Sequence, residues 1–297
     1  MNVDPAVIEA LRPLLWGLAY RMTGTVQDAD DIAQEALIRA WRQPPADQER
    51  PLRPWLVSVT MNLARDVLRA RRRRAYIGPW LPAPVADSRL LDDALGDGDH
   101  ARYAWLVAAE RLTPTQRAVV LCREVLDLSA AETAVTLRCT PHAVDAALSR
   151  ARAALGQPAR SPSLVDDGLL TAFLTLLRLG LPGPAARLLH PEAVALTDGG
   201  GAVNAARMPV IGAAKVVQFF RRINRLYPPN VRVRLERCNG LLTVIGELPP
   251  TGPARDGRLP NAFTLAARVD ANRIVGFWSV VAPAKLAGVC GHEGARV

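Results

Sequence analysis

Cysteine is scarce in this sequence of 297 residues, and the residues that it does contain form no recognisable site. Cys122, Cys139, Cys238 and Cys290 lie far apart and include no CxxC pair, which argues against a disulfide scaffold and against a structural zinc site. No apolar run reaches the ~18 residues that cross a bilayer, and no signal-peptide pattern opens the chain. These absences predict a protein of the reducing cytoplasm without a membrane segment, metal ion or cofactor.

Lysine is also rare, so arginine supplies nearly all of the positive charge. Lys215 and Lys285 are the only lysines, yet the formal net charge is +9 and the isoelectric point is near 10.2. This excess predicts an anionic partner, with nucleic acid ahead of a membrane surface. Hydrophobic residues make up 49% of the chain, which is a globular composition long enough for two or three domains.

The first half of the chain shows helix signals and no strand pattern. Residues 1–75 read as three helices, of which the first begins at Pro5 and continues to Tyr20. Pro44, Pro45, Pro51 and Pro54 bracket a loop before the third. Residues 76–104 read as a linker that is first rich in proline and then acidic. Residues 105–157 contain three capped helices, which begin at Thr113, Ser129 and Thr140.

The second half mixes helix and strand patterns from residue 163 to residue 297. Helices are predicted at about 164–179, 183–189 and 212–226, and strands at 230–238, 241–247, 262–270 and 273–281. Asn239-Gly240 is a strong two-residue hairpin signal between the first two strands. The order predicts an α+β domain with an antiparallel meander.

The strongest motif is a helix-turn-helix at residues 128–155. Val144, Leu148, Ala151 and Leu155 recur at helical spacing and turn the second helix onto its module. Outward residues near the start of such a helix reach base edges in the major groove, and flanking arginines suit phosphates. The DNA-binding residues predicted here are His142, Asp145, Ala146, Ser149, Arg150 and Arg152. A plain helical hairpin with a solvated face is the alternative.

A cluster of arginines closes the third helix of the first segment. The helix dipole favours some cations there, but six within ten residues exceed what capping needs, which favours phosphate binding. Upstream, Trp55 offers a stacking surface, although packing is its commoner role, and Asn62 offers an amide for a base edge. The cluster consists of Arg65, Arg69, Arg71, Arg72, Arg73 and Arg74.

The second helix, in the segment DADDIAQEALIRAW at 28–41, carries an acidic stripe of Asp28, Asp31 and Glu35. An inward apolar stripe on another face consists of Ala29, Ile32, Ala33, Ala36 and Ala40. The simplest interpretation is an amphipathic helix in which Glu35 and Arg39 form an i,i+4 pair. A separate acidic face on a basic protein also indicates a protein partner.

Three segments together resemble bacterial extracytoplasmic-function (ECF) sigma factors: DADDIAQEALIRAW, PWLVSVTMNLARDVLRARRRR, and LTPTQRAVVLCREVLDLSAAETA followed by SRARAAL. They match regions 2 and 4 in order and spacing. The resemblance implies two all-α modules that bind the β′ coiled coil and β flap of core RNA polymerase. Region 2 would hold the −10 promoter element as unstacked single strand, and region 4 would read the −35 duplex. The implied β′-binding residues are Asp28, Asp31, Ile32, Glu35 and Leu37.

Further motifs resemble the subgroup that carries a C-terminal SnoaL-like (NTF2-like) domain, a curved α+β cone. These are YIGPWLPAP in the linker, LTDGGG at 196–201 and APAKL at 282–286, where the subgroup usually has NPDKL. We expect the linker to pack near the Asp198 turn and to fix the separation of regions 2 and 4, so that the fused domain acts as a regulator. The contact residues are Tyr76, Trp80, Asp198, Gly199, Gly200, Gly201 and Lys285.

Many SnoaL-like domains are enzymes, so a DNA-binding module fused to a catalytic domain is the alternative function. Catalysis next to a carbonyl needs a carboxylate base in an apolar pocket and an oxyanion donor. Asp198 is the single acid that the motifs select, and His190, Tyr227 and Trp278 offer no pairing by spacing. We therefore expect no catalytic residues, and a small molecule in the pocket remains a further partner that the resemblance allows. An autonomous helix-turn-helix repressor is a third hypothesis.

Overall fold

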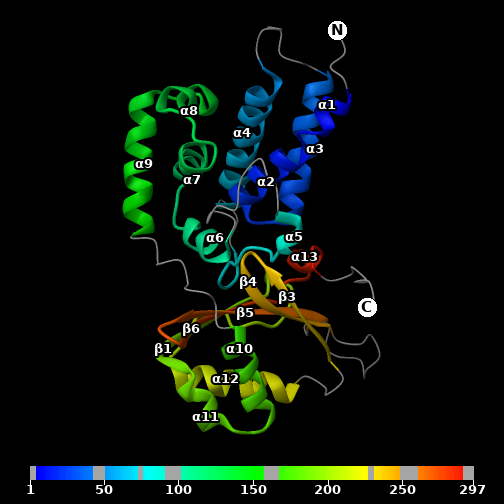
Figure 1. The fold of residues 1–297 in the computed structure, drawn as a ribbon, viewed down its shortest axis with the longest axis vertical. Coiled ribbons are helices and arrows are strands. Elements are labelled where there is room, and N and C mark those ends of the chain that lie inside the picture. Colours follow the sequence, from blue (N-terminus) through cyan, green and yellow to red (C-terminus); the bar gives the residue numbers. More distant parts are fainter. Residues whose placement is uncertain are drawn as a thin grey trace. The chain divides into compact units, whose positions relative to one another are not determined.

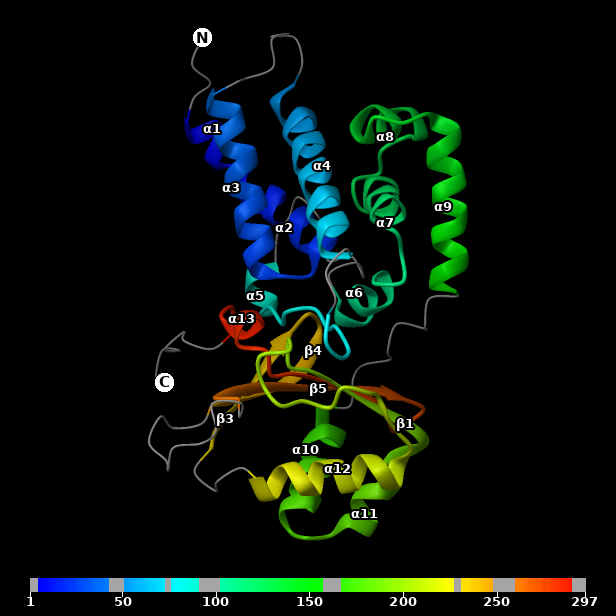
Figure 2. The same ribbon diagram turned by 180° about the vertical axis from the view of Figure 1, so that it is seen from behind.

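The computed structural model describes residues 5–42, 51–72, 76–90, 102–156, 167–226, 231–247 and 260–289. Its contacts divide the chain into two compact units, which Figures 1 and 2 show as ribbons. The first unit comprises residues 1–75 and 88–159, and the second comprises 76–87 and 160–297. The first twelve residues of the predicted linker are therefore part of the C-terminal unit.

The N-terminal part of the first unit is a helical bundle around a fully buried helix. Every residue of α2 from Leu14 to Thr23 is buried, and α3 and α4 pack against it. The sequence predicts one helix from Pro5 to Tyr20, but Pro13 in the first turn of α2 favours a new helix start. Gly24, with φ of 70°, ends α2 in the left-handed conformation. The helices are α1 (Pro5–Glu9), α2 (Arg12–Thr23), α3 (Val26–Arg42) and α4 (Leu52–Arg72).

The rest of the first unit holds the predicted helix-turn-helix. Thr113 and Ser129 each form the capping box that the sequence predicts, with Gln116 and Glu132 as partners. None of the helices in the described ranges is long and apolar enough to cross a bilayer. The elements are α5 (Asp87–Leu90), α6 (Tyr103–Ala109), α7 (Pro114–Val120), the π-helical η2 (Leu121–Val125), α8 (Ala130–Leu137) and α9 (Pro141–Leu155).

The second unit is an α+β domain with a six-stranded sheet in the order β2-β1-β6-β5-β4-β3. The helices are α10 (Asp167–Arg178), α11 (Pro182–Arg187), α12 (Ala213–Leu226) and α13 (Pro283–Leu286). The strands are β1 (Leu189–Asp198), β2 (Val210–Ile211), β3 (Arg232–Cys238), β4 (Leu241–Glu247), β5 (Ala262–Asp270) and β6 (Arg273–Val280).

The sheet corrects the predicted four-stranded antiparallel meander. The antiparallel strands β3 to β6 are present, and Asn239 and Gly240 turn the first hairpin with φ of 51° and 76°. Strands β1 and β2 were not predicted, and β1 pairs with β6 in parallel. Strand β1 gives a weak signal because its inward residues Ala193, Ala195 and Thr197 are small, and Pro191 interrupts its alternation.

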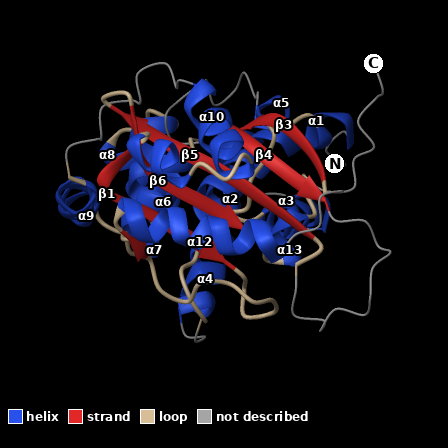
Figure 3. Ribbon diagram, turned by 90° about the horizontal axis from the view of Figure 1, so that it is seen from below, coloured by secondary structure: helices blue, strands red, loops and turns tan. Residues whose placement is uncertain are grey.

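The two faces of this sheet are covered differently. Helices α10, α11 and α12 cover one face and enclose an apolar core that includes Phe173, Phe220 and Phe277. Helix α13 lies on the other face (Figures 1 and 2). The linker segment Tyr76–Asp87 is tied to the sheet by a bridge between Ala86 and Cys238 and by a hydrogen bond from the Asn239 amide to the Val85 carbonyl. Figure 3 shows the strands in red.

Burial of Cys122 and Cys238 leads to a pH prediction. Burial raises the pKa of each thiol from its ordinary value of 9.0 to about 12. A raised folded-state pKa adds stability that is complete below pH ~9 and is lost as the pH rises towards ~12. We expect both thiols to resist alkylation at pH 8.5 in the folded chain, while the partly exposed Cys139 reacts. Mass spectrometry of the alkylated peptides, with urea-unfolded chain as the control, would measure this, and rapid native labelling of Cys122 would contradict it.

Candidate functional site

Helix α9 presents the face that the sequence predicts for DNA. Val144, Leu148 and Ala151 are buried against the module, and Thr140 caps the helix by accepting a hydrogen bond from the Ala143 amide. The outward residues are exposed except Ala146, which is half-buried. Arg152 is held by Glu124 at 2.9 Å. The exposed members of the set are His142, Asp145, Ser149, Arg150 and Arg152.

Helix α4 uses several of its predicted DNA-binding side chains within the first unit. Ser58 donates to the Thr136 carbonyl at 2.8 Å, and Asn62 donates to the same oxygen at 3.1 Å. Arg65, only 9% exposed, donates to the Leu137 carbonyl at 2.9 Å. These carbonyls end α8, the first helix of the helix-turn-helix. Asn62 and Arg65, which were expected to face DNA, therefore bond to backbone carbonyls of the helix-turn-helix here.

The end of α4 extends this contact between the two regions. Arg71 donates to the Thr23 carbonyl at 2.7 Å and lies 3.4 Å from Glu110, while Arg72 donates to the Leu112 carbonyl. Arg69 pairs with the exposed Asp66 on its own helix at 3.0 Å. Trp55 is half-buried. Arg73 and Arg74 lie outside the described residues, as does most of the loop predicted at 43–53.

A buried arginine that the sequence analysis did not select completes the contact. Arg117 of α7 is 1% exposed, donates to the Arg21 carbonyl of α2 at 3.0 Å and pairs with Glu110 at 2.5 Å. Burial lowers the pKa of its guanidinium, which Glu110 opposes, but arginine keeps its charge. No local pattern reveals such a residue, because its partners lie up to 96 positions away.

The acidic stripe on α3 is only partly the surface that the resemblance implies. Asp31 is exposed, Asp28 and Glu35 are half-buried, and Glu35 forms the predicted pair with Arg39 at 2.7 Å. Ile32 and Leu37 require a correction, because they are 4% and 3% exposed. Both side chains pack inward, Ile32 as a member of the predicted inward stripe, so neither is open to a partner in this structure.

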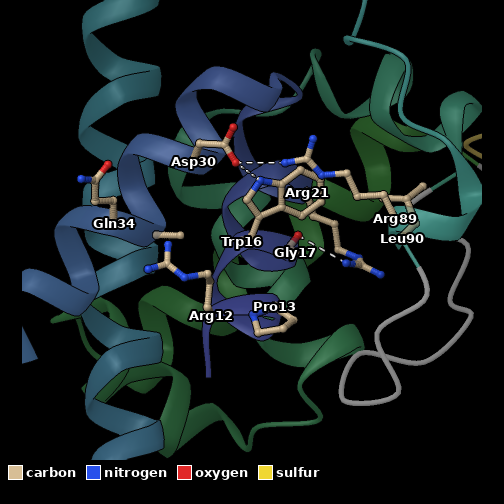
Figure 4. A pocket seen from close by; sticks show the side chains of 10 residues that line it. Arg12, Pro13, Trp16, Gly17, Arg21, Asp30, Gln34, Arg89 and Leu90 are labelled. Atoms are coloured by element: carbon tan, nitrogen blue, oxygen red, sulfur yellow. Dashed lines mark hydrogen bonds and ion pairs between the residues drawn. The ribbon is translucent and has the colours of Figure 1, made fainter. Parts of the chain in front are cut away.

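A shallow pocket of about 370 Å³ opens beside α2 and α3 (Figure 4). In its wall the Trp16 indole donates to Asp30 at 2.6 Å. Arg89 stacks over the Trp16 ring at 4.4 Å and pairs with Asp30 at 3.1 Å. The carboxylate of Asp30 therefore already has two partners. The contacts in this pocket hold α2, α3 and the segment Ser88–Leu90 together.

The three subgroup motifs meet in one buried cluster of the second unit. Asp198, 0% exposed, accepts hydrogen bonds from the Tyr76 hydroxyl at 2.5 Å, the Leu81 amide at 2.8 Å and the Gly200 amide at 2.9 Å. It also pairs with Lys285 at 2.6 Å. We call the four side chains Tyr76, Trp80, Asp198 and Lys285 the linker clamp.

Lys285 fastens the linker from the other side. Its ammonium donates to the Leu81 carbonyl at 2.6 Å and lies 4.0 Å from the centre of the Trp80 ring and 5.1 Å from that of Tyr76. The turn Gly199–Gly201 lets the chain pass close by, since Gly200 and Gly201 have φ of 62° and 75°. The expected contact between the linker and the Asp198 turn is therefore present.

The clamp bears on the catalytic alternative. Asp198 is occupied by four partners and is sealed from solvent, so it is not a free base. Neighbouring residues of a strand point to opposite faces, so Thr197 faces α10 and α12 while Asp198 faces the linker. His190 is exposed, Trp278 lies on the linker side of the sheet, and Tyr227 is outside the described residues.

These features define a class of protein. The first unit holds a helical bundle with an acidic face and an arginine-rich helix, joined to a helix-turn-helix. The second is an α+β domain of the SnoaL-like class that grips the segment connecting the two helical modules. This is the architecture of a multidomain transcription factor with a fused accessory domain.

Comparison with known proteins identifies the family. Residues 7–74 match the Sigma-70 region 2 family, and residues 103–155 match Sigma-70, region 4. The chain is 34% identical to the ECF RNA polymerase sigma factor SigJ of Mycobacterium tuberculosis over 96% of this chain and 94% of that protein. It is 34% identical to SigG of the same species over 53% of this chain and 48% of that protein.

The fold agrees with this result. The crystal structure of Mycobacterium tuberculosis SigJ superposes with a TM-score of 0.76 at 30% identity, over 96% of this chain and 99% of that one. The protein belongs to the ECF RNA polymerase sigma factors and carries a C-terminal SnoaL-like domain.

Proposed function

We propose how this sigma factor divides its work among the described elements. The acids Asp28, Asp31 and Glu35 dock on the β′ coiled coil of core polymerase, and region 4 contacts the β flap. Helix α4 and the loop before it hold the −10 element, and α9 reads the −35 duplex. The observation that carries the proposal is the capped helix α9 with its exposed polar face, which is the geometry of a recognition helix.

Run-off transcription tests this division directly. Sigma-free core polymerase is mixed with the full chain and with genomic fragments that include the DNA upstream of its own gene. We expect a promoter-specific transcript that depends on the chain, and the absence of one from every fragment would defeat the proposal. An autonomous repressor would instead bind duplex sites without polymerase.

We further propose that the described first unit is a closed state that polymerase opens. Asn62 and Arg65 cannot contact DNA while they, together with Ser58, hold the end of α8. A docking surface on polymerase that binds the open state more tightly shifts the population towards it.

A steric wedge tests the closed state. We expect Ser58→Trp to push α8 away from α4, because Ser58 is half-buried at their contact and has no assigned role with DNA. Hydrogen exchange should accelerate at α8, and small-angle scattering should report a larger radius of gyration for the full chain. Val135→Trp, at a position of α8 that is 71% exposed, is the matched control. Equal exchange in both folded variants would contradict the closed state.

The arginine cluster gives a prediction on salt dependence. We expect Arg71→Ala with Arg73→Ala to weaken promoter binding on every sequence, because phosphate contacts carry no base information. The slope of log K against log salt should flatten by about one unit per lost contact. Binding isotherms of the polymerase complex at several salt concentrations measure the slope, with circular dichroism as a control because Arg71 also bonds Thr23. A loss confined to some promoters would assign these arginines to base reading.

The C-terminal unit regulates, in our proposal, and does not catalyse. The clamp fixes the linker Tyr76–Asp87 and so biases the separation of regions 2 and 4 that a promoter demands. Deletion from about residue 205 onward should change promoter-specific transcription several-fold, and removal of the LTDGGG turn as well should give a different result. If both truncated chains transcribe like the full chain, the regulatory role is wrong and the enzyme hypothesis regains support.

A further inference from the structure

A second cavity, of about 860 Å³, lies in the C-terminal unit between the sheet and helices α10 and α12. It is on the face of the sheet opposite the linker clamp. Most of its wall is apolar, with aromatic rings from α12 and from β5. Its volume is within the range of sites that enclose a small organic ligand. Characteristic wall residues are Leu174, Phe219, Phe220, Val244, Phe263 and Leu265.

Polar side chains interrupt this apolar wall in a few places, among them Asn204, Asn224 and a pair of hydroxyls. Thr197 of β1 and Ser279 of β6 are paired in the sheet and both line the cavity. Thr197 is only 6% exposed, and neither hydroxyl bonds to another described residue. Both residues border the cavity and neither hydroxyl is engaged elsewhere in the described chain, so this pair is suited to a ligand that brings its own oxygen or nitrogen.

The charges around the cavity are all of one sign. Arg178 of α10 and Arg222 of α12 line it and are exposed, and neither has an ion pair with a described residue. The described lining contains no Asp or Glu that would neutralise them. It also contains no His, Cys, Lys or Tyr, so the described wall offers a place to bind but no group for acid–base or nucleophilic chemistry.

We propose that this cavity binds an apolar organic acid. Its hydrocarbon or aromatic body fills the space among Phe219, Phe263 and Leu265, and its carboxylate or sulfonate lies against Arg178 and Arg222. A polar atom on the body bonds the Thr197–Ser279 pair. The proposal rests on the C-terminal unit alone, so its failure and the failure of promoter recognition are separate results.

A matched pair of fluorescent probes tests the charge and the apolar space. 1-Anilinonaphthalene-8-sulfonate is an apolar acid, and N-phenyl-1-naphthylamine has the same rings without the sulfonate. We expect the full chain to bind one molecule of the sulfonate with saturation, several-fold more tightly than the neutral probe. Added salt should weaken the sulfonate alone, because exposed ion pairs are screened.

Variants assign the binding to this cavity. Arg222→Gln and Arg178→Gln should each weaken the sulfonate about fivefold and leave the neutral probe unchanged, since an exposed ion pair contributes modestly. Arg221→Gln is the control, because Arg221 is exposed on the same helix but is outside the lining. Loss of affinity in Arg221→Gln alone, or no loss in either lining variant, would overturn the arginine assignment.

Substitutions that fill the cavity provide a second test of the proposal. Ser279→Phe should abolish binding of both probes, and Val233→Trp should do so from the lining edge strand β3, where Val233 is 53% exposed and a larger side chain is tolerated. Circular dichroism confirms that each variant is folded. Sulfonate binding that persists unchanged in both folded variants, or equal affinity for the two probes, would overturn the proposal.

Discussion

Replacing both Asp31 and Glu35 with arginine is expected to abolish binding to core polymerase while α3 stays folded. The double variant Asp31→Arg with Glu35→Arg reverses two charges that the helix does not need for packing, since Asp31 is exposed and Glu35 forms only a surface pair with Arg39. Such a pair contributes less than ~1 kcal/mol to stability. Like charges across an interface cost several times more, so we expect the dissociation constant to rise by about 100-fold or more.

Fluorescence anisotropy of the labelled chain with core polymerase measures this affinity. Gln34→Arg is the matched control, because Gln34 is exposed on the same helix but lies outside the acidic stripe. Circular dichroism must show unchanged helix content. Full affinity in the double variant would remove the acidic stripe from the interface and leave region 2 to dock by another face.

Lys285→Met is expected to release the linker from the C-terminal unit. The change leaves the Asp198 carboxylate buried without its cation, and breaking one partner of a buried pair costs about 3–5 kcal/mol. The Leu81 amide reports the event directly because it donates to Asp198. We expect its hydrogen exchange to accelerate by about 100-fold or more, while amides in the paired strands β4 and β5 change less.

A surface pair in the same unit provides the comparison. Glu236→Gln breaks an ion pair between Arg234 and Glu236 that is 3.4 Å long and more than a third exposed, and should alter stability by under ~1 kcal/mol. The double variant Asp198→Asn with Lys285→Met should recover part of the loss, because it removes the unpaired charge. If Leu81 exchanges slowly in a folded Lys285→Met chain, the clamp does not hold the linker.

Local chemistry explains which parts of the fold were predictable. Thr113 and Ser129 cap helices and Asn239 forms a turn, each through residues one to three positions away. A short stretch of sequence is therefore enough to predict them. Strand β1 has no such signal, because its identity depends on β6, about 80 positions later. The break before α2 was missed for a different reason: the apolar periodicity continues from Val7 to Tyr20 across Pro13, although proline there favours a helix start.

The position of a candidate site residue was predictable where it depends on its own helix, and not where it depends on a contact with a distant part of the chain. The outward face of α9 follows from helical spacing alone. The contact of Arg65 with the Leu137 carbonyl does not, because a backbone acceptor leaves no trace in the sequence. The resemblance assigned Ile32 and Leu37 to the docking surface, but α2 and α4 cover α3 on two sides, so its buried face includes Leu37 as well as the predicted inward stripe.

The parallel pairing of β1 with β6 sets the order in which the chain can mature on the ribosome. Domains fold as they emerge, N-terminal first, so both DNA-binding modules are complete before the last strand exists. The Asp198 carbonyl accepts hydrogen bonds from the Val281 and Ala282 amides, and its carboxylate pairs with Lys285. None of these contacts can form until those later residues have been synthesised. Contacts across such long separations form slowly. In a nascent chain regions 2 and 4 therefore precede the linker clamp, which cannot form until Lys285 has left the ribosome.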